Sequence, residues 1–421
     1  MKIGIVGSGG REHAICFFLK KSKKIKKIYC FPGNAGTKKI AENININTEN
    51  FDKFLFFIKK NKIDLIIIGP EKPLVDGLVD FLEKNNIKVF GPNGIGSKLE
   101  GSKIFTKNLC KKYKIPTAKF GVFSKLNEAK KFSINAKYPL VVKADNIASG
   151  KGVYICNNKY ESTLAIEEIF KGKFGAAKNV LIEEYLKGEE MSFFIVTDGK
   201  NIKTFGTAQD HKRVFEGDTG KNTGGMGAYS PSRLINDELE KKIVNKIIRP
   251  TLKGMQTFKV KYKGFLYAGL MIYRNEPYLI EYNVRMGDPE CQTILPKLKT
   301  DLLDVILACC EERLNNLKIE WNNKKSLCVV LCSKGYPETY NKNVRIKGFK
   351  KIKIDNKKDY LFHAGTREIN KKIYATGGRV LNFVSVSKNF STARNKIHKN
   401  LNKLNWEGGF YRKDIGFKVI N

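Results

Sequence analysis

The sequence predicts an α/β protein that begins with a doubly wound parallel sheet. Short apolar strands alternate with helical stretches over the first hundred residues, and each strand ends in a turn rich in glycine or proline. A later stretch, residues 279–290 (LIEYNVRMGDPE), alternates apolar and polar residues with the period of a strand. At 421 residues the chain is long enough for about three domains.

The first domain is expected over residues 1–100. Its expected strands are Ile3–Val6, Ile28–Phe31, Leu65–Ile68 and Lys88–Phe90, and its expected helices lie near His13–Lys21, Phe51–Lys60 and Val75–Lys84. Ligands of such sheets bind beyond the carboxyl ends of the strands, where residues 7–10 (GSGG) could hold a phosphate at a helix N-terminus. A dinucleotide fits less well, because Glu12 replaces the third glycine of its fingerprint. A tight turn without a ligand is the alternative.

The second block, from about residue 101, has features of a triphosphate site. Lys143 ends an apolar strand, and residues 146–153 (NIASGKGV) then lead into the next strand. A glycine-lysine-glycine loop between paired strands can close over phosphates as a flap, although an ordinary hairpin has the same composition. Val180–Leu186 is expected as a strand whose end hydrogen-bonds a base. The acids near Gly188 could take ribose hydroxyls or form only an exposed turn.

A polar, glycine-rich segment at residues 207–231 has no apolar period. It concentrates His211 among Asp, Arg and Met residues, which favours a mobile substrate loop over a disordered tract.

One face of the 279–290 strand is expected to hold Glu281, Asn283 and Arg285. The opposite, packing face is expected to hold Ile280, Tyr282, Val284 and Met286. A carboxylate, an amide oxygen and a guanidinium in a row suit Mg²⁺ bridging phosphates beside a transferring phosphoryl group. The polar side of an antiparallel strand has the same pattern, so both interpretations stay open.

Composition excludes several classes of protein. The chain is 42% hydrophobic and 11% aromatic, as expected of a globular protein, and its nine scattered cysteines predict buried, reduced thiols. The net charge of +37 is spread over Lys-, Asn- and Ile-rich surface segments, which favours compositional drift over a nucleic-acid site. Because no signal-peptide pattern and no long apolar run occurs, we expect a cytoplasmic protein without a membrane partner.

Motifs along the whole chain resemble the glycinamide ribonucleotide synthetase family of ATP-grasp ligases. They are GSGGREHA, PGNAG, GPEKPLVDGLVD, LEGSKIFTKN, VVKADNIASGKGV, IEEYLKGEE, TAQDHKRVFEGDTGKNTGGMGAYSP, YNVRMGDPECQ, FHAGT, TGGRVLN and GFYRKDIG. The resemblance implies the doubly wound domain at 1–100, a two-lobed ATP-grasp domain at 101–323 with its flap lobe at about 118–190, and a small C-terminal α+β domain at 324–421. In the last of these, strands are expected at Ser326–Cys332 and Leu361–Gly365, and a helix at Ser391–Leu401.

The resemblance also implies the reaction: glycine and 5-phosphoribosylamine are joined while ATP is cleaved, through glycyl phosphate, with Mg²⁺ or Mn²⁺. The implied catalytic residues are Arg285, Lys143, Lys151, Asp210, His211, Lys212, Asp288 and Glu290. The implied nucleotide contacts are Lys103, Lys143, Ser149, Gly150, Lys151, Gly152, Glu183, Glu184, Tyr185, Leu186 and Glu189. The implied substrate contacts are Gly9, Gly10, Arg11, Thr223, Gly224, Gly225, Met226 and Gly227, and the implied metal ligands are Glu281 and Asn283. A monomer with small-molecule partners and no nucleic acid is expected.

Four residues depart from the family pattern: Asn146 and Ser149 in the flap, Lys72, and Cys291 beside Glu290. Residues 267–272 (YAGLMI) supply no second acid for a metal, which leaves that role to Glu281 and Asn283. Two other functions stay open: an ATP-grasp ligase for another carboxylate and amine, and a nucleotide-binding protein without catalysis.

Overall fold

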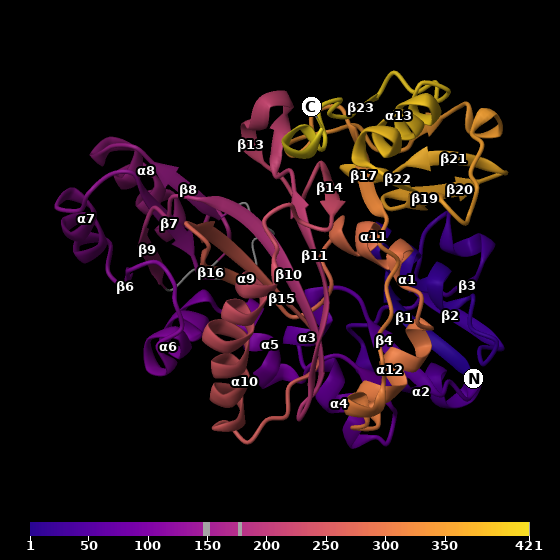
Figure 1. Cartoon of the computed structure of the whole chain (residues 1–421), viewed down its shortest axis with the longest axis horizontal. Helices are drawn as coiled ribbons and strands as arrows, with labels where there is room; N and C mark the ends of the chain where they lie inside the picture. The colour runs from indigo at the N-terminus through magenta and orange to yellow at the C-terminus, as the bar shows by residue number, and fades with distance from the viewer. Residues whose placement is uncertain (146–151, 176–178, 421) are drawn as a thin grey trace.

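The first domain contains the predicted parallel sheet. The computed structural model describes residues 1–145, 152–175 and 179–420 (Figure 1). All neighbouring strands of the first sheet are parallel, in the order β3-β2-β1-β4-β5. The strands are β1 (Lys2–Gly7), β2 (Lys27–Pro32), β3 (Glu42–Asn43), β4 (Leu65–Ile68) and β5 (Val89–Phe90). The doubly wound sheet is thus confirmed, and β3 is a short strand that the sequence did not predict.

Both faces of this sheet are covered, which explains its nearly continuous apolar strands. Ile3 and Ile5 face one core, shared with α1 (Gly10–Leu19) and α12 (Leu302–Cys310). Val6 faces the other side of the sheet. It belongs to a second core, shared with α2 (Phe51–Asn61) and α4 (Leu78–Lys84). The helix expected near Val75–Lys84 is confirmed from Leu78 as α4, but its beginning differs, because Gly77 has a φ of +86° and separates α4 from the short helix α3 (Glu71–Val75).

The flap lobe is a separate four-stranded sheet with its own small core, and it projects at the left of Figure 1. Its order is β6-β9-β7-β8, with helices on one face. The elements are β6 (Phe120–Phe123), α7 (Leu126–Ile134), β7 (Leu140–Ala144), β8 (Val153–Cys156), α8 (Lys159–Phe170) and β9 (Val180–Glu184). The antiparallel pairing of β7 with β8 confirms the expected hairpin, while residues 146–151 at its tip lie outside the described residues.

A larger sheet runs from the ATP-grasp region into the C-terminal region without a break. Its order is β16-β15-β10-β11-β14-β17-β22-β19. The strands are β10 (Glu189–Asp198), β11 (Ile202–Asp210), β14 (Gly227–Ser230), β15 (Lys263–Tyr273), β16 (Glu276–Asn283), β17 (Lys325–Ser333), β19 (Asp359–His363) and β22 (Arg379–Ser387), with β23 (Gly409–Phe410) beside β17. The boundary predicted at residues 323/324 therefore falls between strands of one continuous sheet, and the division into domains stays a prediction.

Two sequence predictions are corrected here. The segment at 207–231 is not one unstructured loop, because it contains the end of β11, the hairpin of β12 (Arg213–Phe215) and β13 (Thr219–Asn222), and β14. Ile280 does not share the packing face of Tyr282, because a bulge places Gly269 opposite Glu281 but Leu270 opposite Leu279.

The remaining elements cover the sheets or connect them. Helices α5 (Gly94–Gly101) and α6 (Lys103–Tyr113) join the first domain to the flap lobe. Others are α9 (Asp237–Ile243), α10 (Arg249–Gln256), α11 (Glu290–Ile294) and α13 (Phe390–Leu401), with a three-stranded sheet of β18 (Val344–Ile346), β20 (Thr366–Ile369) and β21 (Lys372–Ala375). The C-terminal strands and helix expected from the sequence are confirmed within two residues at each end.

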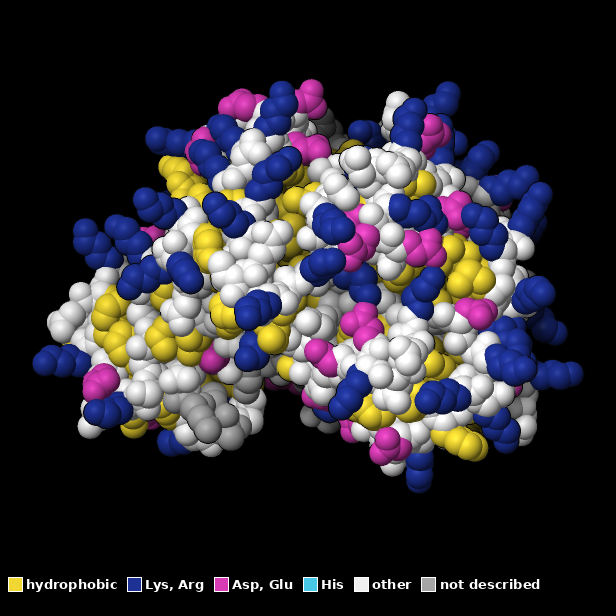
Figure 2. Space-filling model, turned by 90° about the horizontal axis from the view of Figure 1, so that it is seen from below, with side chains coloured by type: hydrophobic (Ala, Val, Ile, Leu, Met, Phe, Trp, Pro, Cys, Tyr) yellow, Lys and Arg dark blue, Asp and Glu magenta, His cyan; other side chains and the backbone are white. Residues whose placement is uncertain are grey.

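The distribution of surface charge agrees with the expectation that the positive charge is spread out rather than concentrated in one place. On the face shown in Figure 2, Lys and Arg side chains stand apart from one another, with acidic and uncharged surface between them. All nine cysteines are free thiols, and eight are buried, as predicted. Among the described residues, none of the helices combines the length and apolar character needed to cross a membrane.

Candidate functional site

Two lysines predicted to bind phosphate lie beside the strand predicted to bind metal. Lys143 lies in β7 and is 6% exposed. Lys103 begins α6, where Ser102 caps the helix, and its nearest charges include Glu281, Lys143 and Asp145. Burial lowers the pKa of Lys103, and these carboxylates oppose that effect. The fold thus brings cations from α6 and β7 to the polar face of β16.

The predicted metal ligands lie on the same face of β16. Glu281 pairs with Gly269 and Asn283 with Tyr267 on the neighbouring strand, so β15 adds no acid beside them. Across residues 1–145, 152–175 and 179–420, no cluster of three His, Cys, Asp or Glu side chains could hold a metal. A carboxylate and an amide oxygen nevertheless fit Mg²⁺, which commonly takes one or two protein ligands together with phosphates and water.

Arg285 has a structural role that the sequence did not predict. Its Nε lies 2.9 Å from Oε2 of Glu71 in α3, and one terminal nitrogen lies 2.6 Å from Oε1 of Glu100 in α5. The same nitrogen donates to Oδ1 of Asn283 at 3.2 Å. Arg285 therefore joins three segments of the chain and orients a predicted metal ligand. Its contact with the transferring phosphoryl group stays a prediction.

The glycine-rich turn after β1, where a phosphate is expected, lies against protein carboxylates. Gly9 N donates to Oε2 of Glu12 at 2.6 Å, and Arg11 N donates to Oδ2 of Asp288 at 3.2 Å. The Arg11 guanidinium pairs with Glu12 at 2.6 Å. A Cβ on Gly10 would lie 2.5 Å from Nε2 of Gln292. In this arrangement the backbone amides of Gly9 and Arg11 have anionic partners, and binding of a phosphate at this turn stays a prediction.

Buried acids form a cluster where β11, β10 and α11 meet. Asp210 at the end of β11 has one carboxylate oxygen, Oδ1, that is buried without a hydrogen-bond partner. Burial and the neighbouring Glu290 raise its pKa well above the ordinary value. Glu290 accepts from Oγ of Ser192 at 3.2 Å. Lys212 pairs with Glu190 at 2.8 Å. Two neighbouring carboxylates, one with an unpartnered oxygen, suit a small cationic group.

Asp288, in contrast, has several protein partners. It accepts from Gln292 Nε2 at 2.7 Å and lies 3.5 Å from Arg379. Although burial raises its pKa, Arg379 and Arg11 hold the pKa of Asp288 below the ordinary value. Asp210 and Glu290 therefore have fewer hydrogen-bond and ion-pair partners than Asp288.

His211 is a core residue, although its segment is expected to form a mobile substrate loop. The side chain is 2% exposed; Nε2 accepts from Gly416 N at 3.1 Å and Nδ1 lies 3.3 Å from Gly227 O. Burial lowers its pKa to about 4.

The Thr223–Gly227 turn packs beneath the acids. Met226 is fully buried against Sγ of Cys332, so it belongs to the core and not to a substrate surface. Gly225 has a φ of +113°, and a Cβ there would lie 2.8 Å from Asp210 Oδ1. The turn needs glycine at this position so that the backbone can approach the carboxylate.

The other predicted nucleotide contacts have different environments. Glu183 is 4% exposed and pairs with Lys143, so it is not a surface acid for ribose. Tyr185 is 41% exposed, Leu186 follows it in the connection between β9 and β10, and Glu184 accepts from Lys119 N. Glu189 pairs with Arg233. Gly152 is buried at the start of the returning strand, while Ser149, Gly150 and Lys151 lie outside the described residues.

Two residues near the predicted site residues were not predicted from the sequence. Arg379, in β22 of the C-terminal region, donates to the backbone carbonyls of Gly224 and Asp288. Lys107, in α6, pairs with Glu183. Only their place in the motifs TGGRVLN and LEGSKIFTKN could have indicated them. Lys72 pairs with Asp76 and Glu49 on the surface, and Cys291 is buried.

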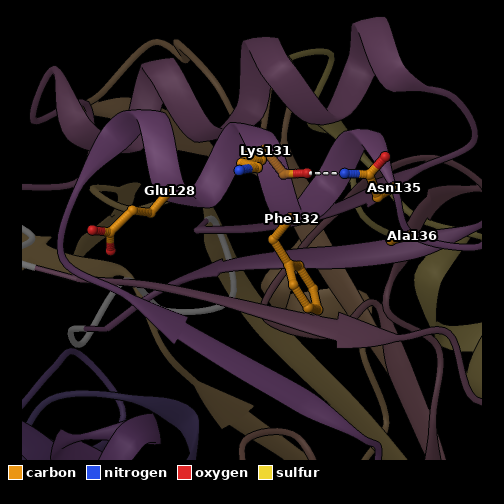
Figure 3. Close-up of a pocket in the computed structure, with 5 residues that line it drawn as sticks. All are labelled: Glu128, Lys131, Phe132, Asn135 and Ala136. Carbon is orange, nitrogen blue, oxygen red and sulfur yellow. Dashed lines mark hydrogen bonds between the residues drawn. The ribbon is translucent and has the colours of Figure 1, made fainter.

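A hollow of about 380 Å³ lies elsewhere, on the outer helix α7 of the flap lobe (Figure 3). Its lining residues are Glu128, Lys131, Phe132, Asn135 and Ala136. None of them is a predicted site residue, and they all come from one helix and its end. This hollow is not the site described above.

Comparisons with known proteins agree over the full chain. Three profiles of one family match: "Phosphoribosylglycinamide synthetase, N domain" at residues 1–100, "ATP-grasp (A) domain" at 101–291 and "C domain" at 326–418. Phosphoribosylamine–glycine ligase from Caldanaerobacter subterraneus subsp. tengcongensis is 44% identical over 417 residues, which cover 99% of both chains. The Brucella melitensis ligase is 43% identical, with 100% of this chain and 98% of its own covered.

Solved structures give the same fold. The crystal structure of phosphoribosylamine–glycine ligase from Thermotoga maritima superposes with a TM-score of 0.86 at 33% identity, covering 99% of this chain and 100% of its own. The biotin carboxylase domain of Hydrogenobacter thermophilus 2-oxoglutarate carboxylase superposes with a TM-score of 0.75 at 16% identity, covering 97% of this chain and 91% of its own. The second likeness concerns the fold alone.

Proposed function

The chain belongs to the phosphoribosylglycinamide synthetase family, and from this membership we infer that it joins glycine to 5-phosphoribosylamine with cleavage of ATP to ADP and phosphate. It is an ATP-dependent carbon–nitrogen ligase with an ATP-grasp fold, and its product, glycinamide ribonucleotide, belongs to purine biosynthesis. The observation that carries this inference within the site is the convergence of Lys103, Lys143 and Glu281 from three elements. That convergence suits a triphosphate.

The reaction requires activation of a carboxylate, because an amine does not displace oxygen from a carboxylate anion. We propose that a carboxylate oxygen of glycine attacks the γ-phosphorus, the bond to the β-phosphate oxygen breaks, and ADP leaves. Lys103 and Lys143 would neutralise charge on the transferred group, which is the main protein contribution to phosphoryl transfer. The amine of phosphoribosylamine then attacks the acyl carbon, phosphate leaves, and the amine loses a proton.

Glu281 and Asn283 would hold a divalent ion, Mg²⁺ or Mn²⁺. When bound, the ion would neutralise phosphate oxygens. Arg285 lies 3.2 Å from Oδ1 of Asn283 and so keeps that oxygen turned toward the polar face. Residues 149–151 of the flap, with Gly152, Glu184, Tyr185 and Leu186, would complete the nucleotide site.

Asp210 and Glu290 would take the ammonium group of glycine. A cation there would give Asp210 Oδ1 the partner that it lacks and would offset the raised pKa of that carboxyl group. Lys212, Thr223, Gly224 and Arg379 would border the acceptor substrate. We expect Asp210→Asn to raise KM for glycine about tenfold with little change in KM for ATP. An unchanged KM for glycine would remove Asp210 from this role.

Release of ADP, with each substrate omitted in turn, tests the whole reaction. We expect ADP only when glycine, phosphoribosylamine and ATP are all present. Full activity without glycine would favour another carboxylate, and no turnover with any amine would favour a protein that only binds nucleotide. Glu281→Gln should lower turnover severely at a fixed concentration of the metal ion, whereas Glu276→Gln is a matched control at the start of the same strand, where Glu276 pairs with Lys242 and Lys246 on the surface.

We also propose a cytoplasmic monomer whose partners are these small molecules and not nucleic acid. Light scattering of the purified protein tests the monomer, and a second peak at twice the mass would contradict it. ADP release in Mg²⁺ and in Mn²⁺ separately decides the metal preference.

A further inference from the structure

A buried group of three charges lies behind the proposed triphosphate site. Glu183 of β9 lies between two ammonium groups. Lys143 Nζ donates to Oε2 at 2.7 Å, whereas Lys107 Nζ lies 2.9 Å from Oε1 as an ion pair without the geometry of a hydrogen bond. The three side chains are 4%, 7% and 3% exposed, respectively. Such a group is stable only while its members compensate one another, since an isolated buried charge is costly.

Lys107 is also connected, through Thr117, to the strand that bears the predicted metal ligands. Its Nζ donates to Oγ1 of Thr117 at 2.6 Å, and that hydroxyl donates to the carbonyl of Leu279 at 2.6 Å. Leu279 lies in β16, two residues before Glu281. The Phe120 ring centroid lies 5.6 Å from the same ammonium. Lys107 is therefore the link between Glu183 of the flap lobe and β16 of the central sheet.

The charges of this group are unequal. Two lysines and one glutamate leave one positive charge in excess, and Lys143 is the member on which the proposed function places phosphate. Burial raises the pKa of Glu183, but Lys143 and Lys107 outweigh burial and hold this pKa below the ordinary value. Glu183 therefore stays ionised. Without Lys107, Glu183 would neutralise Lys143, and this group of side chains would offer no excess positive charge to a triphosphate.

We propose that Lys107 is a positioning residue for nucleotide binding: it occupies one oxygen of Glu183 so that Lys143 keeps its charge available for phosphate, and through Thr117 it fixes the distance between Lys143 and the Glu281 strand. This inference rests on the proposed function, because that function assigns Lys143 to the triphosphate. The Lys107 side chain is 3% exposed, and its ammonium lies against Glu183 and Thr117.

The test compares nucleotide binding and turnover in Lys107→Met and Lys111→Met. Lys111 lies one turn further along α6 and is exposed, so it is a matched control. Calorimetric binding of ADP and AMP should show ADP weakened about tenfold or more in Lys107→Met and AMP changed much less, because the effect acts through the charge that meets the outer phosphate. Lys111→Met should match the unmodified protein with both nucleotides.

Steady-state kinetics give the second readout. KM for ATP should rise and kcat fall in Lys107→Met, while KM for glycine stays within about twofold, a split that general loss of structure would not produce. Lys107→Arg should recover part of the ADP affinity because it keeps the positive charge. Equal ADP affinity in Lys107→Met and the unmodified protein would overturn the proposal, as would an equal loss of ADP and AMP binding.

Thr117→Val serves where Lys107→Met does not fold. It keeps all three charges and the backbone hydrogen bond from Leu279 N to Pro116 O, and it removes the hydroxyl that connects Lys107 to the Leu279 carbonyl, so ADP affinity should be retained while kcat falls. Unchanged kcat would refute the link to β16. ADP binding is measured without glycine or phosphoribosylamine, so failure of this inference is distinguishable from failure of the proposed reaction.

Discussion

Replacement of Arg285 by Met tests whether this residue holds the first domain against the metal-bearing strand. Its guanidinium lies 2.9 Å from Glu71 and 2.6 Å from Glu100, and the three side chains are 15%, 20% and 9% exposed. Removing one partner of a buried ion pair typically costs ~3–5 kcal/mol, because the remaining charges stay buried without compensation. We expect Arg285→Met to lose stability in this range at pH 7.5.

The pH dependence of this loss identifies its cause. Burial raises the pKa of Glu71, but Arg285 and Arg11 outweigh burial and hold this pKa below the ordinary value. Burial keeps the pKa of Glu100 above the ordinary value. Without Arg285 both carboxyl pKa values should rise above those of the unfolded chain, so the folded variant binds more protons than the unfolded one. The stability of the variant should therefore increase as pH falls from 7.5 toward 5, and its deficit should shrink.

Chemical denaturation followed by circular dichroism at both pH values measures the effect. Arg313→Met is the control, because Arg313 pairs with Glu311 on the surface at 45% and 37% exposure and should cost less than about 1 kcal/mol. A loss below about 1 kcal/mol for Arg285→Met, or a loss that does not depend on pH, would refute the structural role. Turnover that falls far more than ATP affinity would support the additional catalytic role.

Three further predictions concern other parts of the molecule. Burial lowers the pKa of His13 to about 3, so the folded protein favours the neutral imidazole. The free energy of unfolding should therefore fall as pH drops below about 6.5, by ~2 kcal/mol at pH 5. His13→Asn should reduce this pH dependence when the free energy of unfolding is measured by denaturation over the same range. Gly225→Ala should cost ~1–3 kcal/mol and raise KM for glycine, because its Cβ would lie 2.6 Å from Pro289 and 2.8 Å from Asp210; normal glycine kinetics would contradict this. Glu281→Gln should raise the Mg²⁺ or Mn²⁺ concentration needed for ADP release, and an unchanged titration would remove Glu281 from the metal site.

The fold class could be predicted from the sequence because it depends on local patterns. Apolar runs separated by turns gave the parallel sheet, and the hairpin of β7 and β8 follows from two apolar segments flanking a glycine-lysine-glycine loop. These patterns depend on a few neighbouring residues, so they can be recognised without knowledge of distant contacts. The polar face of Glu281 and Asn283 was predictable for the same reason.

Contacts between distant segments could not be predicted in this way. Asp288 lies beside the turn of Gly9 and Arg11 although 277 residues separate it from Arg11. This contact fills a turn whose composition indicated an open phosphate site. Likewise, His211 belongs to a segment with the composition of a binding loop, yet the strands on either side of it place its ring in the core.

The sequence by itself determined the classes of element, the order of the motifs and the family resemblance, because these depend on residue types and their spacing along the chain. The tertiary structure alone decided which charges compensate one another: Arg285 with Glu71 and Glu100, and Lys107 with Glu183 and Lys143. The physical reason is that the energy of a buried charge depends on partners within a few ångströms, whatever their separation in sequence. Folding supplies those partners.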